Sequence, residues 1–437
     1  MYKTPYPFQE AAIERCMETM GQIVADECGL GKTLTAIETA KRVRQLFTPE
    51  RWRCLIICPP ALIPQWEDEI ADQDPGIPAA IVNRLPVDVQ SIYGYLLMSI
   101  YDLTSPLVRE AFQKTLLDMV IVDEAHRIKN RKTKTARWIK HIPTVRRIAL
   151  TGTPMEKNPA DLWSILNFIA PQDFPAYWGF VMRNLIVESG YWEKYIVGGP
   201  KDPEAFGELL SPYMIRRTKE EVVPELPEKL AFEIRVPLNE PQKELYDEIR
   251  KQKDILVTAG DRELFIPNAL ALLTRLQQIS AYPPLLDFDA GIGSAKLDWL
   301  ATFMEDHPND KLVVFTRFRN LALHLREKYD AGVVVGGLRE IPDNPSRVIG
   351  TIDAMGEGLN FQWAKHAIFL DSHWSTIKMT QAVDRIHRVN IKEPKNLYFL
   401  WSTAEDRLVL DAMNRKMSES ELVYYFLNKE TDYVYDG

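Results

Sequence analysis

Short apolar runs alternate with amphipathic stretches in two regions of the chain. Runs of this length that are apolar throughout are typical of strands buried on both faces, as in a parallel sheet. The alternation of strands and helices therefore predicts an α/β fold with one parallel sheet in each region. The runs lie at residues 23–26, 54–59, 119–123 and 147–152 in the first region, and at 311–316, 332–337, 347–352, 366–371 and 396–401 in the second.

The segments between these runs follow a helical period. In the segment 34–47, apolar side chains recur at the spacing of one helix face, at Leu34, Ile37, Ala40, Val43 and Phe47. From about 160 to 285 the helical pattern continues without a clear strand run. We therefore expect an amino-terminal lobe at 1–160, an α-helical insert or hinge at 161–290, and a carboxyl-terminal lobe with a final helix at 291–437.

The composition is that of an ordinary globular protein. Of its 437 residues, 46% are hydrophobic and 26% are charged, and a chain of this length suits two or three domains. The formal net charge is -8, whereas a protein that binds nucleic acid over its whole surface is basic. Any contact with nucleic acid is therefore expected in a local basic groove.

The cysteines and the apolar segments narrow the class of protein further. All four cysteines lie in the first 60 residues, with no histidine nearby, so we expect reduced, buried thiols and no structural zinc. We expect no secretory signal and no membrane segment, since no stretch reaches the roughly 18 apolar residues that span a bilayer. The sequence predicts a protein without a membrane segment, in the cytoplasm of a bacterial or phage-infected cell or in a eukaryotic nucleus.

The stretch DECGLGKT at residues 26–33 is close to a phosphate-binding loop. It follows an expected strand and opens an expected helix, so the backbone N–H groups of Gly29, Leu30 and Gly31 can face phosphate oxygens. Lys32 would reach the β and γ phosphates of ATP, and the Thr33 hydroxyl would bind Mg²⁺. The first glycine of the usual pattern is replaced by Asp26, so an ordinary helix start remains the alternative.

The stretch MVIVDEAH at 119–126 ends a buried strand in two carboxylates. If this strand lies beside the strand of the phosphate loop, its carboxyl end is where Mg²⁺ is held. We assign Asp123 to the metal, Glu124 to orienting or deprotonating the attacking water, and His126 to coupling the site to the rest of the protein. The alternative is a pair of acids at a helix start.

The stretch QAVDRIHR at 381–388 predicts a helix in the second region. Its polar face would carry Gln381, Asp384, Arg385 and Arg388. Arginines on such a face are usually solvated, but Arg385 and Arg388 are also suited to act as arginine fingers supplied by the opposite lobe. Hydrolysis would then depend on closure between the lobes.

A basic block without acids follows the carboxylate motif, at residues 127–147. Its cations, among them Lys129, Arg131 and Lys132, are suited to contact the phosphates of a DNA backbone without distinguishing bases. The alternative is a solvated basic helix. A smaller basic group lies at Arg216, Arg217 and Lys219, for which packing between the lobes is an equal alternative.

Taken in order, these motifs resemble those of the Swi/Snf-type DNA translocases of helicase superfamily two. The resemblance extends from about Phe8 to past residue 400, and VIVDEAHRIKN followed by ALTGTPMEKNPADLWSILNFIAP is its most specific part. It implies two RecA-like lobes, ATP and Mg²⁺ as cofactors, and movement along double-stranded DNA without strand separation.

The resemblance also implies roles for single residues. Gln9 would recognise adenine, Thr151 and Thr153 would link hydrolysis to the DNA groove, and Gln381 would couple nucleotide to DNA. The loop at 356–360, with Gly358 and Asn360, would contact the nucleotide and the DNA backbone. The sequence departs from the family pattern after Arg388, where Val389 and Asn390 stand, and the segment 336–347 is shorter than expected.

Three functions are compatible with these motifs. The leading hypothesis is a DNA-stimulated ATPase that translocates on duplex DNA, in a minimal bacterial or phage-like form acting in repair, recombination or replication. The second is a helicase that separates or anneals strands at forks, on single-stranded or branched DNA. The third is a nucleotide-gated clamp with vestigial hydrolysis. Cys28 is expected to be a small apolar replacement for methionine, with a redox switch as the alternative, and Trp66 is expected to pack in the core.

Overall fold

The chain forms two compact units, Met1–Pro224 and Glu225–Gly437, in a computed structural model. Each unit contains one large sheet covered by helices on both faces, so the predicted α/β class is confirmed. The division does not follow the expected boundaries, because the stretch 161–290 is shared between the units. The structure describes residues 3–46, 51–82, 89–155, 158–188, 196–223, 225, 227–251, 262–356, 358–389 and 391–415.

The sheet of the first unit has seven strands, all parallel, in the order β3-β4-β2-β5-β6-β1-β9. The four predicted runs form β1, β2, β5 and β6. The strands are β1 Gly21–Val24, β2 Arg53–Cys58, β3 Ala79–Val82, β4 Gly94–Ser99, β5 Leu117–Val122, β6 Thr144–Leu150 and β9 Met214–Ile215. A separate antiparallel hairpin joins β7 Leu185–Glu188 and β8 Ile196–Pro200.

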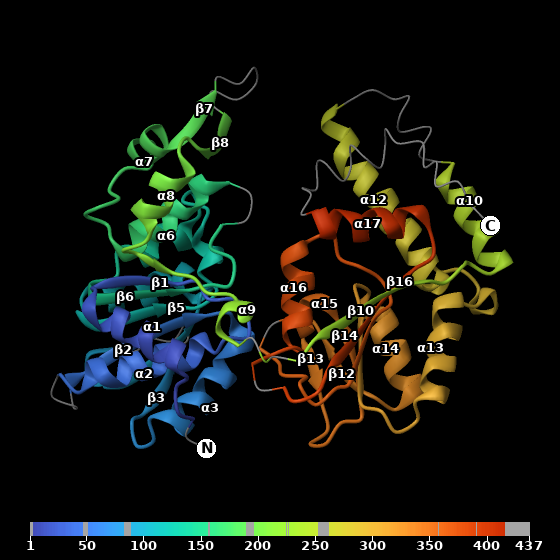
Figure 1. The fold of residues 1–437 in the computed structure, drawn as a ribbon, viewed down its shortest axis with the longest axis horizontal. Coiled ribbons are helices and arrows are strands. Elements are labelled where there is room, and N and C mark those ends of the chain that lie inside the picture. Colours follow the sequence, from blue (N-terminus) through green and yellow to red (C-terminus); the bar gives the residue numbers. More distant parts are fainter. Residues whose placement is uncertain are drawn as a thin grey trace. The chain divides into compact units, whose positions relative to one another are not determined.

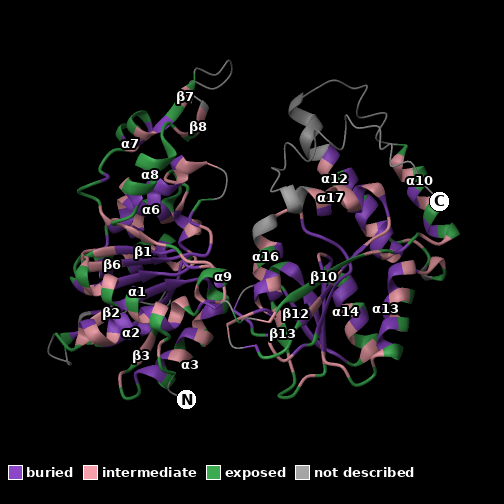
Figure 2. Cartoon of the chain, in the orientation of Figure 1, coloured by how far each residue is buried: buried purple, intermediate pink, exposed green. Residues whose placement is uncertain are grey.

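Helices cover both faces of this sheet (Figure 1). On one face, α2 and α3 pack on side chains such as Cys54 and Ile56, and on the other α6 packs on Leu55 and Ile57. Strand residues are therefore buried from both sides (Figure 2). The helices are α1 Pro7–Glu18, α2 Lys32–Arg44, α3 Ile63–Gln73, α4 Pro106–Gln113, α5 Lys134–Ile139, α6 Leu162–Ile169, α7 Tyr177–Asn184, α8 Pro203–Leu210 and α9 Lys219–Val222.

The sheet of the second unit also has seven strands, in the order β10-β16-β15-β11-β14-β12-β13. All neighbours are parallel except β12 and β13. The five predicted runs form β11, β12, β14, β15 and β16. The strands are β10 Lys229–Arg235, β11 Leu312–Thr316, β12 Gly332–Val335, β13 Leu338–Glu340, β14 Arg347–Thr351, β15 His366–Phe369 and β16 Lys395–Trp401.

Two layers of helices enclose the second sheet. α13 and α14 pack on one face, with Leu300 and Leu321 against Val314, and α15 and α16 pack on the other. Further helices form a core of their own around Leu273 and Leu276. The helices are α10 Glu240–Arg250, α12 Arg262–Ala281, α13 Ala295–Asp306, α14 Arg319–Tyr329, α15 Ile352–Met355, α16 Thr376–Asp384 and α17 Ala404–Arg415.

The expected helical insert at 161–290 also contains strands. Strand β10 was not expected because its sequence contains no continuous apolar run. Six of its seven residues are exposed, as is usual for a strand at the edge of a sheet. The expected helix at 34–47 forms α2, and its apolar face is buried at Leu34, Ile37, Ala40 and Val43, whereas Phe47 lies outside the described residues. Within the described ranges, no helix is long and apolar enough to cross a membrane.

Candidate nucleotide site

The loop between β1 and α2 has the backbone of an anion site. Gly29 and Gly31 adopt positive φ angles of 89° and 77°, a region that glycine enters without strain. Gly31 is the N-cap of the 13-residue helix α2, no side chain caps the helix, and its first turn contains no acid. The amino-terminal N–H groups and the positive end of the helix dipole are thus available to phosphate oxygens.

Lys32 and Gln9 both contact this loop. The Lys32 ammonium donates hydrogen bonds to the backbone carbonyls of Asp26 at 2.8 Å and Glu27 at 3.3 Å, which holds the cation over the loop. Gln9 is buried, and its amide nitrogen donates to the carbonyl of Leu30 at 2.9 Å. Its amide oxygen accepts from the N–H of Tyr6. The structure thus places Gln9 against the loop that the sequence assigns to phosphates.

The two carboxylates follow β5, but β5 is not the direct neighbour of β1. Strand β6 pairs with both, so the expected adjacency of the two strands is corrected to one intervening strand. That strand leads into the sequence TGTP, which therefore lies between the phosphate loop and the carboxylates. Asp123 and Lys32 are still close enough that the Lys32 charge partly offsets the rise that burial causes in the pKa of Asp123.

Asp123 accepts a hydrogen bond from Trp66, a residue that was expected only to pack in the core. The indole N–H of Trp66, on α3, donates to Asp123 Oδ2 at 3.0 Å, and the backbone N–H of Glu124 donates to Oδ1 at 2.8 Å. Burial, and secondarily the Glu124 charge, raise the pKa of Asp123 to about 6. Trp66 therefore fixes the orientation of the proposed metal ligand and favours its ionised form.

Glu124 stands in a backbone conformation that is rare for its residue type. Its φ and ψ are both 50°, the left-handed region, which costs energy for any residue except glycine. This turn directs the chain sharply after β5, and Glu124 Oε2 lies 3.2 Å from His126 Nδ1. The geometry thus brings Glu124 and His126 together, and the coupling role of His126 stays a prediction.

Arg217 braces the beginning of the phosphate loop, which the sequence did not indicate. Its guanidinium binds Asp26 through two parallel hydrogen bonds, from Nε at 2.9 Å and from Nη2 at 2.5 Å. A third nitrogen donates to the carbonyl of Phe8, next to Gln9. Because Asp26 is almost fully buried, this pairing supplies the charge that a buried carboxylate requires.

The neighbouring cations of the small basic group at 216–219 contact the same region. Their two expected roles, DNA contact and packing between the lobes, stay predictions. Arg216 Nη1 donates to the carbonyls of Ala25 at 3.1 Å and Gly152 at 3.3 Å. Lys219 is buried, and its backbone N–H donates to Glu27 at 2.8 Å. Acids at the end of a buried strand require cationic partners. This requirement was the signal in the sequence from which cations near Asp26 and Glu27 could have been predicted.

We expect Arg217→Ala to lower the stability of the protein substantially. The substitution leaves the Asp26 carboxylate buried without its partner, and breaking a buried ion pair in this way costs about 3–5 kcal/mol. Urea unfolding of the full chain should show a lower midpoint. The exposed pair of Arg15 and Glu18 provides the control, since Arg15→Ala should cost only about 0–1 kcal/mol. An Arg217→Ala midpoint equal to that of Arg15→Ala would contradict the brace, and adding Asp26→Asn should restore part of the loss.

The TGTP motif contacts the phosphate loop through small residues. A side chain at Gly152 would lie 2.3 Å from Cys28 Sγ, so Cys28 packs directly against this glycine. Thr151 is fully buried, and its hydroxyl accepts the N–H of Thr153 at 3.1 Å. Burial of Thr151 excludes its direct contact with DNA, whereas Thr153 is half-buried, and their role in linking hydrolysis to DNA stays a prediction. Cys28 thus faces the protein, which is compatible with its expected role as a small apolar replacement.

The basic block at 127–147 is not one continuous surface. Arg146 donates to three carbonyls at the end of α1, and Lys140 donates to Ser164 at 3.0 Å. Of the three predicted DNA ligands, Lys132 is exposed, Lys129 is half-buried, and the Arg131 guanidinium stacks 3.9 Å from the centroid of the Tyr177 ring. The exposed cations of the block also include Lys134 and Arg137.

In the second unit, both candidate arginine fingers contact the loop at 356–360. Arg385 Nε donates to the carbonyl of Gly356, and Arg388 Nη2 to that of Leu359, each at 2.8 Å. The predicted helix at 381–388 is shorter than expected, because α16 ends at Asp384. Asp384 is buried and so does not belong to an exposed polar face.

The remaining predicted residues of this unit lie at the same loop. Gly358 is buried and has a φ of 67°, a backbone conformation that glycine adopts without strain and most other residues do not. Asn360 is exposed and bonds through its side chain to Gln362. The Cβ of Gln381 would touch a side chain placed at Gly356. Glu357 and Asn390 lie outside the described residues.

Comparison with known proteins identifies the family to which this arrangement belongs. The sequence matches the profile of the SNF2-related domain over residues 11–285 and that of the helicase conserved C-terminal domain over residues 295–390. Among solved structures, the Sulfolobus solfataricus SWI2/SNF2 ATPase core in complex with dsDNA is 23% identical, with a TM-score of 0.47, over 98% of this chain and 96% of that one.

Curated relatives are similar at the level of sequence. An uncharacterized ATP-dependent helicase of Mycoplasma pneumoniae is 28% identical over 418 residues, covering 89% of this chain and 39% of that protein. The DNA annealing helicase and endonuclease ZRANB3 of Homo sapiens is 28% identical over 458 residues, covering 94% and 39%. The chain thus spans about two fifths of the length of these relatives. Because the first profile alone covers more than half of the residues, the chain belongs to the SNF2-related domain family.

Proposed function

We propose that this protein hydrolyses ATP and uses the reaction to translocate along double-stranded DNA. The observation that carries the proposal is the joint geometry of the phosphate loop, Lys32 and the Asp123–Glu124 pair in a chain of the SNF2-related family. Relatives of the chain are named ATP-dependent helicases. Action in DNA repair, recombination or replication is part of the proposal.

The residues present fit a magnesium nucleotide. Hydroxyl and carboxylate oxygens are the ligands that Mg²⁺ prefers, and Thr33 on the first turn of α2 and Asp123 after β5 supply one of each. When bound, Mg²⁺ would neutralise phosphate charge. Trp66 would keep the Asp123 carboxylate in a fixed orientation toward the ion.

Each remaining residue has a defined part in the proposed reaction. The loop N–H groups and Lys32 bind the phosphate chain, and Lys32 stabilises the charge that accumulates in the transition state. Glu124 orients the attacking water and accepts its proton, and the neighbouring His126 restrains the carboxylate. Arg385 and Arg388 act as arginine fingers, which stabilise charge on the transferred group.

We propose that DNA binds through exposed cations together with Asn360 and Thr153. Lys132, Lys134 and Arg137 are exposed, and cations of this kind contact backbone phosphates irrespective of sequence. Lys129 and Arg131 would support this surface from half-buried positions. The acidic net charge of -8 makes such a local basic surface necessary.

ATP turnover in the presence of different nucleic acids tests the proposal. We expect duplex DNA to raise the rate well above the rate without nucleic acid, and RNA to raise it little. Because the contacts are electrostatic, the stimulation should fall as salt is added. Equal turnover without nucleic acid and with duplex DNA, single strands or RNA would rule out a DNA motor.

A strand-annealing or strand-separating activity is the second candidate, favoured by the similarity to a relative named a DNA annealing helicase. Displacement of a third strand from a triplex reports translocation on duplex DNA, whereas release of a labelled strand from a fork reports separation. We expect triplex displacement without fork unwinding. Fork unwinding or annealing at a comparable rate would favour the second candidate.

A further inference from the structure

A group of three metal-ligand side chains lies at the amino-terminal edge of the second sheet. His307 directly follows α13, Asp310 precedes β11, and His366 is the first residue of β15. Strands β11 and β15 are parallel neighbours, with Leu312 opposite His366. The loop at 356–360, Arg385 and Arg388 take no part in this group, so it is separate from the residues assigned to ATP.

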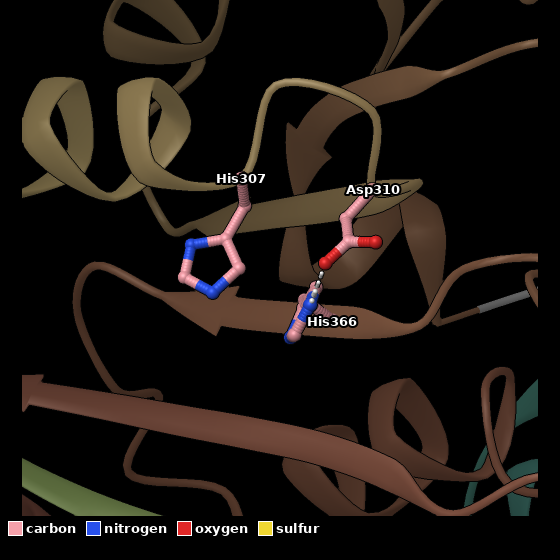
Figure 3. A group of neighbouring side chains, drawn as sticks. All are labelled: His307, Asp310 and His366. Atoms are coloured by element: carbon pink, nitrogen blue, oxygen red, sulfur yellow. Dashed lines mark hydrogen bonds and ion pairs between the residues drawn. The ribbon is translucent and has the colours of Figure 1, made fainter.

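The three side chains face one another (Figure 3). One potential ligand atom from each lies within 4.8 Å of the other two, and this is the one such group found among the described residues. His366 is buried, and His307 and Asp310 are half-buried. His366 Nε2 lies 2.9 Å from Asp310 Oδ2. Two imidazole nitrogens and one carboxylate oxygen form a donor set that suits Zn²⁺ better than Mg²⁺.

The second nitrogen of His307 already has the partner that a metal-bound histidine requires, and that of His366 obtains one by a turn of a neighbouring amide. His307 Nδ1 lies 2.9 Å from the carbonyl oxygen of Phe303, to which it must donate, so the proton is on Nδ1 and Nε2 carries a lone pair. His366 Nδ1 lies 3.3 Å from the side-chain amide nitrogen of Asn396, which is a donor. A half-turn of that amide presents its oxygen to Nδ1–H and leaves His366 Nε2 as a ligand.

Aromatic rings fix the orientation of the two imidazoles. The Phe303 ring stacks on His307, with centroids 4.3 Å apart, and meets His366 edge-on at 5.3 Å. Tyr398 lies beside Phe303 and His366, at 5.0 Å and 5.8 Å. An apolar wall on one side of a ligand set restricts rotation and excludes water, which favours tight metal binding.

An ion-pair network is the simpler explanation for part of this group. Asp310 accepts hydrogen bonds from both Lys365 and His366, each at 2.9 Å. Those bonds account for the position of Asp310 against β15. None of the ion pairs recorded for the described residues includes His307, however, although its ring faces His366. The network therefore does not explain why a second imidazole completes the group.

We propose that His307, Asp310 and His366 bind one divalent transition-metal ion, with Zn²⁺ as the best-suited ion and water in the fourth position. A tetrahedral ion at 2.0–2.2 Å from its ligands requires ligand atoms about 3.3–3.6 Å apart. Asp310 Oδ2 and His366 Nε2, now 2.9 Å apart, therefore separate slightly to admit it. Binding replaces the Nε2 proton of His366, which is released to solvent. The ion would tie the 307–311 turn to β15 and so stabilise the second unit.

Zinc binding by the full-length protein tests this site. The protein is stripped with a chelator, incubated with Zn²⁺ in excess Mg²⁺ to occupy the oxygen ligands at Thr33 and Asp123, dialysed, and assayed for zinc by mass spectrometry. We expect one bound ion in the wild type. His307→Ala removes one ligand, and Asp310→Asn removes the negative charge of another. Each substitution should weaken zinc binding by at least about 10–100-fold.

His141→Ala is the matched control, because His141 Nδ1 also bonds to the carbonyl four residues earlier, at 2.7 Å, but is not part of the group. We expect this variant to bind zinc like the wild type. With Co²⁺ in place of Zn²⁺, the wild type and His141→Ala should show the strong visible absorption of a tetrahedral site, and His307→Ala should not. Absence of bound zinc in the wild type, or equal binding by the wild type and His307→Ala, would overturn the proposal.

A folding readout separates the site from ATP hydrolysis. Zn²⁺ should raise the thermal unfolding midpoint of the wild type and of His141→Ala, because a ligand that binds only the folded state stabilises it. It should not raise the midpoint of His307→Ala. These results do not depend on turnover, so the metal site and the ATPase proposal fail independently.

Discussion

Glu124→Gln is expected to bind ATP normally and to hydrolyse it about 10²–10⁴-fold more slowly than the wild type, the range that a general base contributes. Glutamine keeps the size of the side chain and can still accept a hydrogen bond, but it cannot take the proton of the attacking water. Because Glu124 lies directly after Asp123 in a left-handed turn, the substitution leaves the backbone and the phosphate loop in place. Single-turnover hydrolysis and fluorescent-nucleotide binding measure the two effects separately.

Two further variants test whether the loss of hydrolysis is specific to the Glu124 carboxylate. Glu110→Gln, at an exposed position on α4 where Glu110 pairs with Lys114, should hydrolyse ATP like the wild type. Lys32→Ala should lose both binding and turnover, because Lys32 holds the phosphate chain. If Glu124→Gln failed to bind ATP, or retained wild-type turnover, the role assigned to this carboxylate would be wrong.

Arg388→Ala should hydrolyse ATP about 10³–10⁵-fold more slowly than the wild type, the effect of removing an arginine finger. Its affinity for ATP should change far less, because a finger acts on charge that develops in the transition state. The side chain is half-buried and anchored at 2.8 Å to the Leu359 carbonyl. Measuring kcat and nucleotide affinity in the presence of duplex DNA separates loss of catalysis from loss of binding.

The substitution Arg388→Lys tests the geometry of the group. Lysine keeps the charge but lacks the planar fork that binds two oxygens at once, so we expect it to restore little activity. Arg326→Ala, at an exposed ion pair of α14, is the control and should be fully active. An equal loss of ATP affinity and of kcat in Arg388→Ala would instead indicate that Arg388 supports the loop at 356–360.

The sequence predicted most of the central strands of both sheets because burial on two faces selects continuous apolar runs. Strands that are not buried in this way were missed, and so was β4, although all six of its residues are buried. Strand β10 is an edge strand with exposed side chains such as Leu230 and Phe232, and β9 has only two residues. For the same reason the stretch 161–290 was expected to be purely helical, since the segment 229–235 contains no continuous apolar run; the alternation of Leu230, Phe232 and Ile234 was the strand signal that was missed.

The candidate site was predicted where its residues are close in sequence. The phosphate loop and the carboxylate pair are local motifs, and their backbone follows from glycine positions and from the end of a strand. The contacts that support them are not local: Trp66 is 57 residues from Asp123, and Arg217 is 191 residues from Asp26. No periodicity encodes such distances, so only the requirement that buried acids be paired pointed to a missing cation.

The short strand β9 also determines where the first unit can be separated from the rest of the chain. Its residues pair with Ile23 and Val24, and Arg217 directly beyond it neutralises Asp26. A fragment that ended at residue 160 would leave β1 as an unprotected sheet edge, a surface that recruits other strands and causes aggregation. Recombinant expression of this unit alone should therefore yield soluble protein only from fragments that reach Val223.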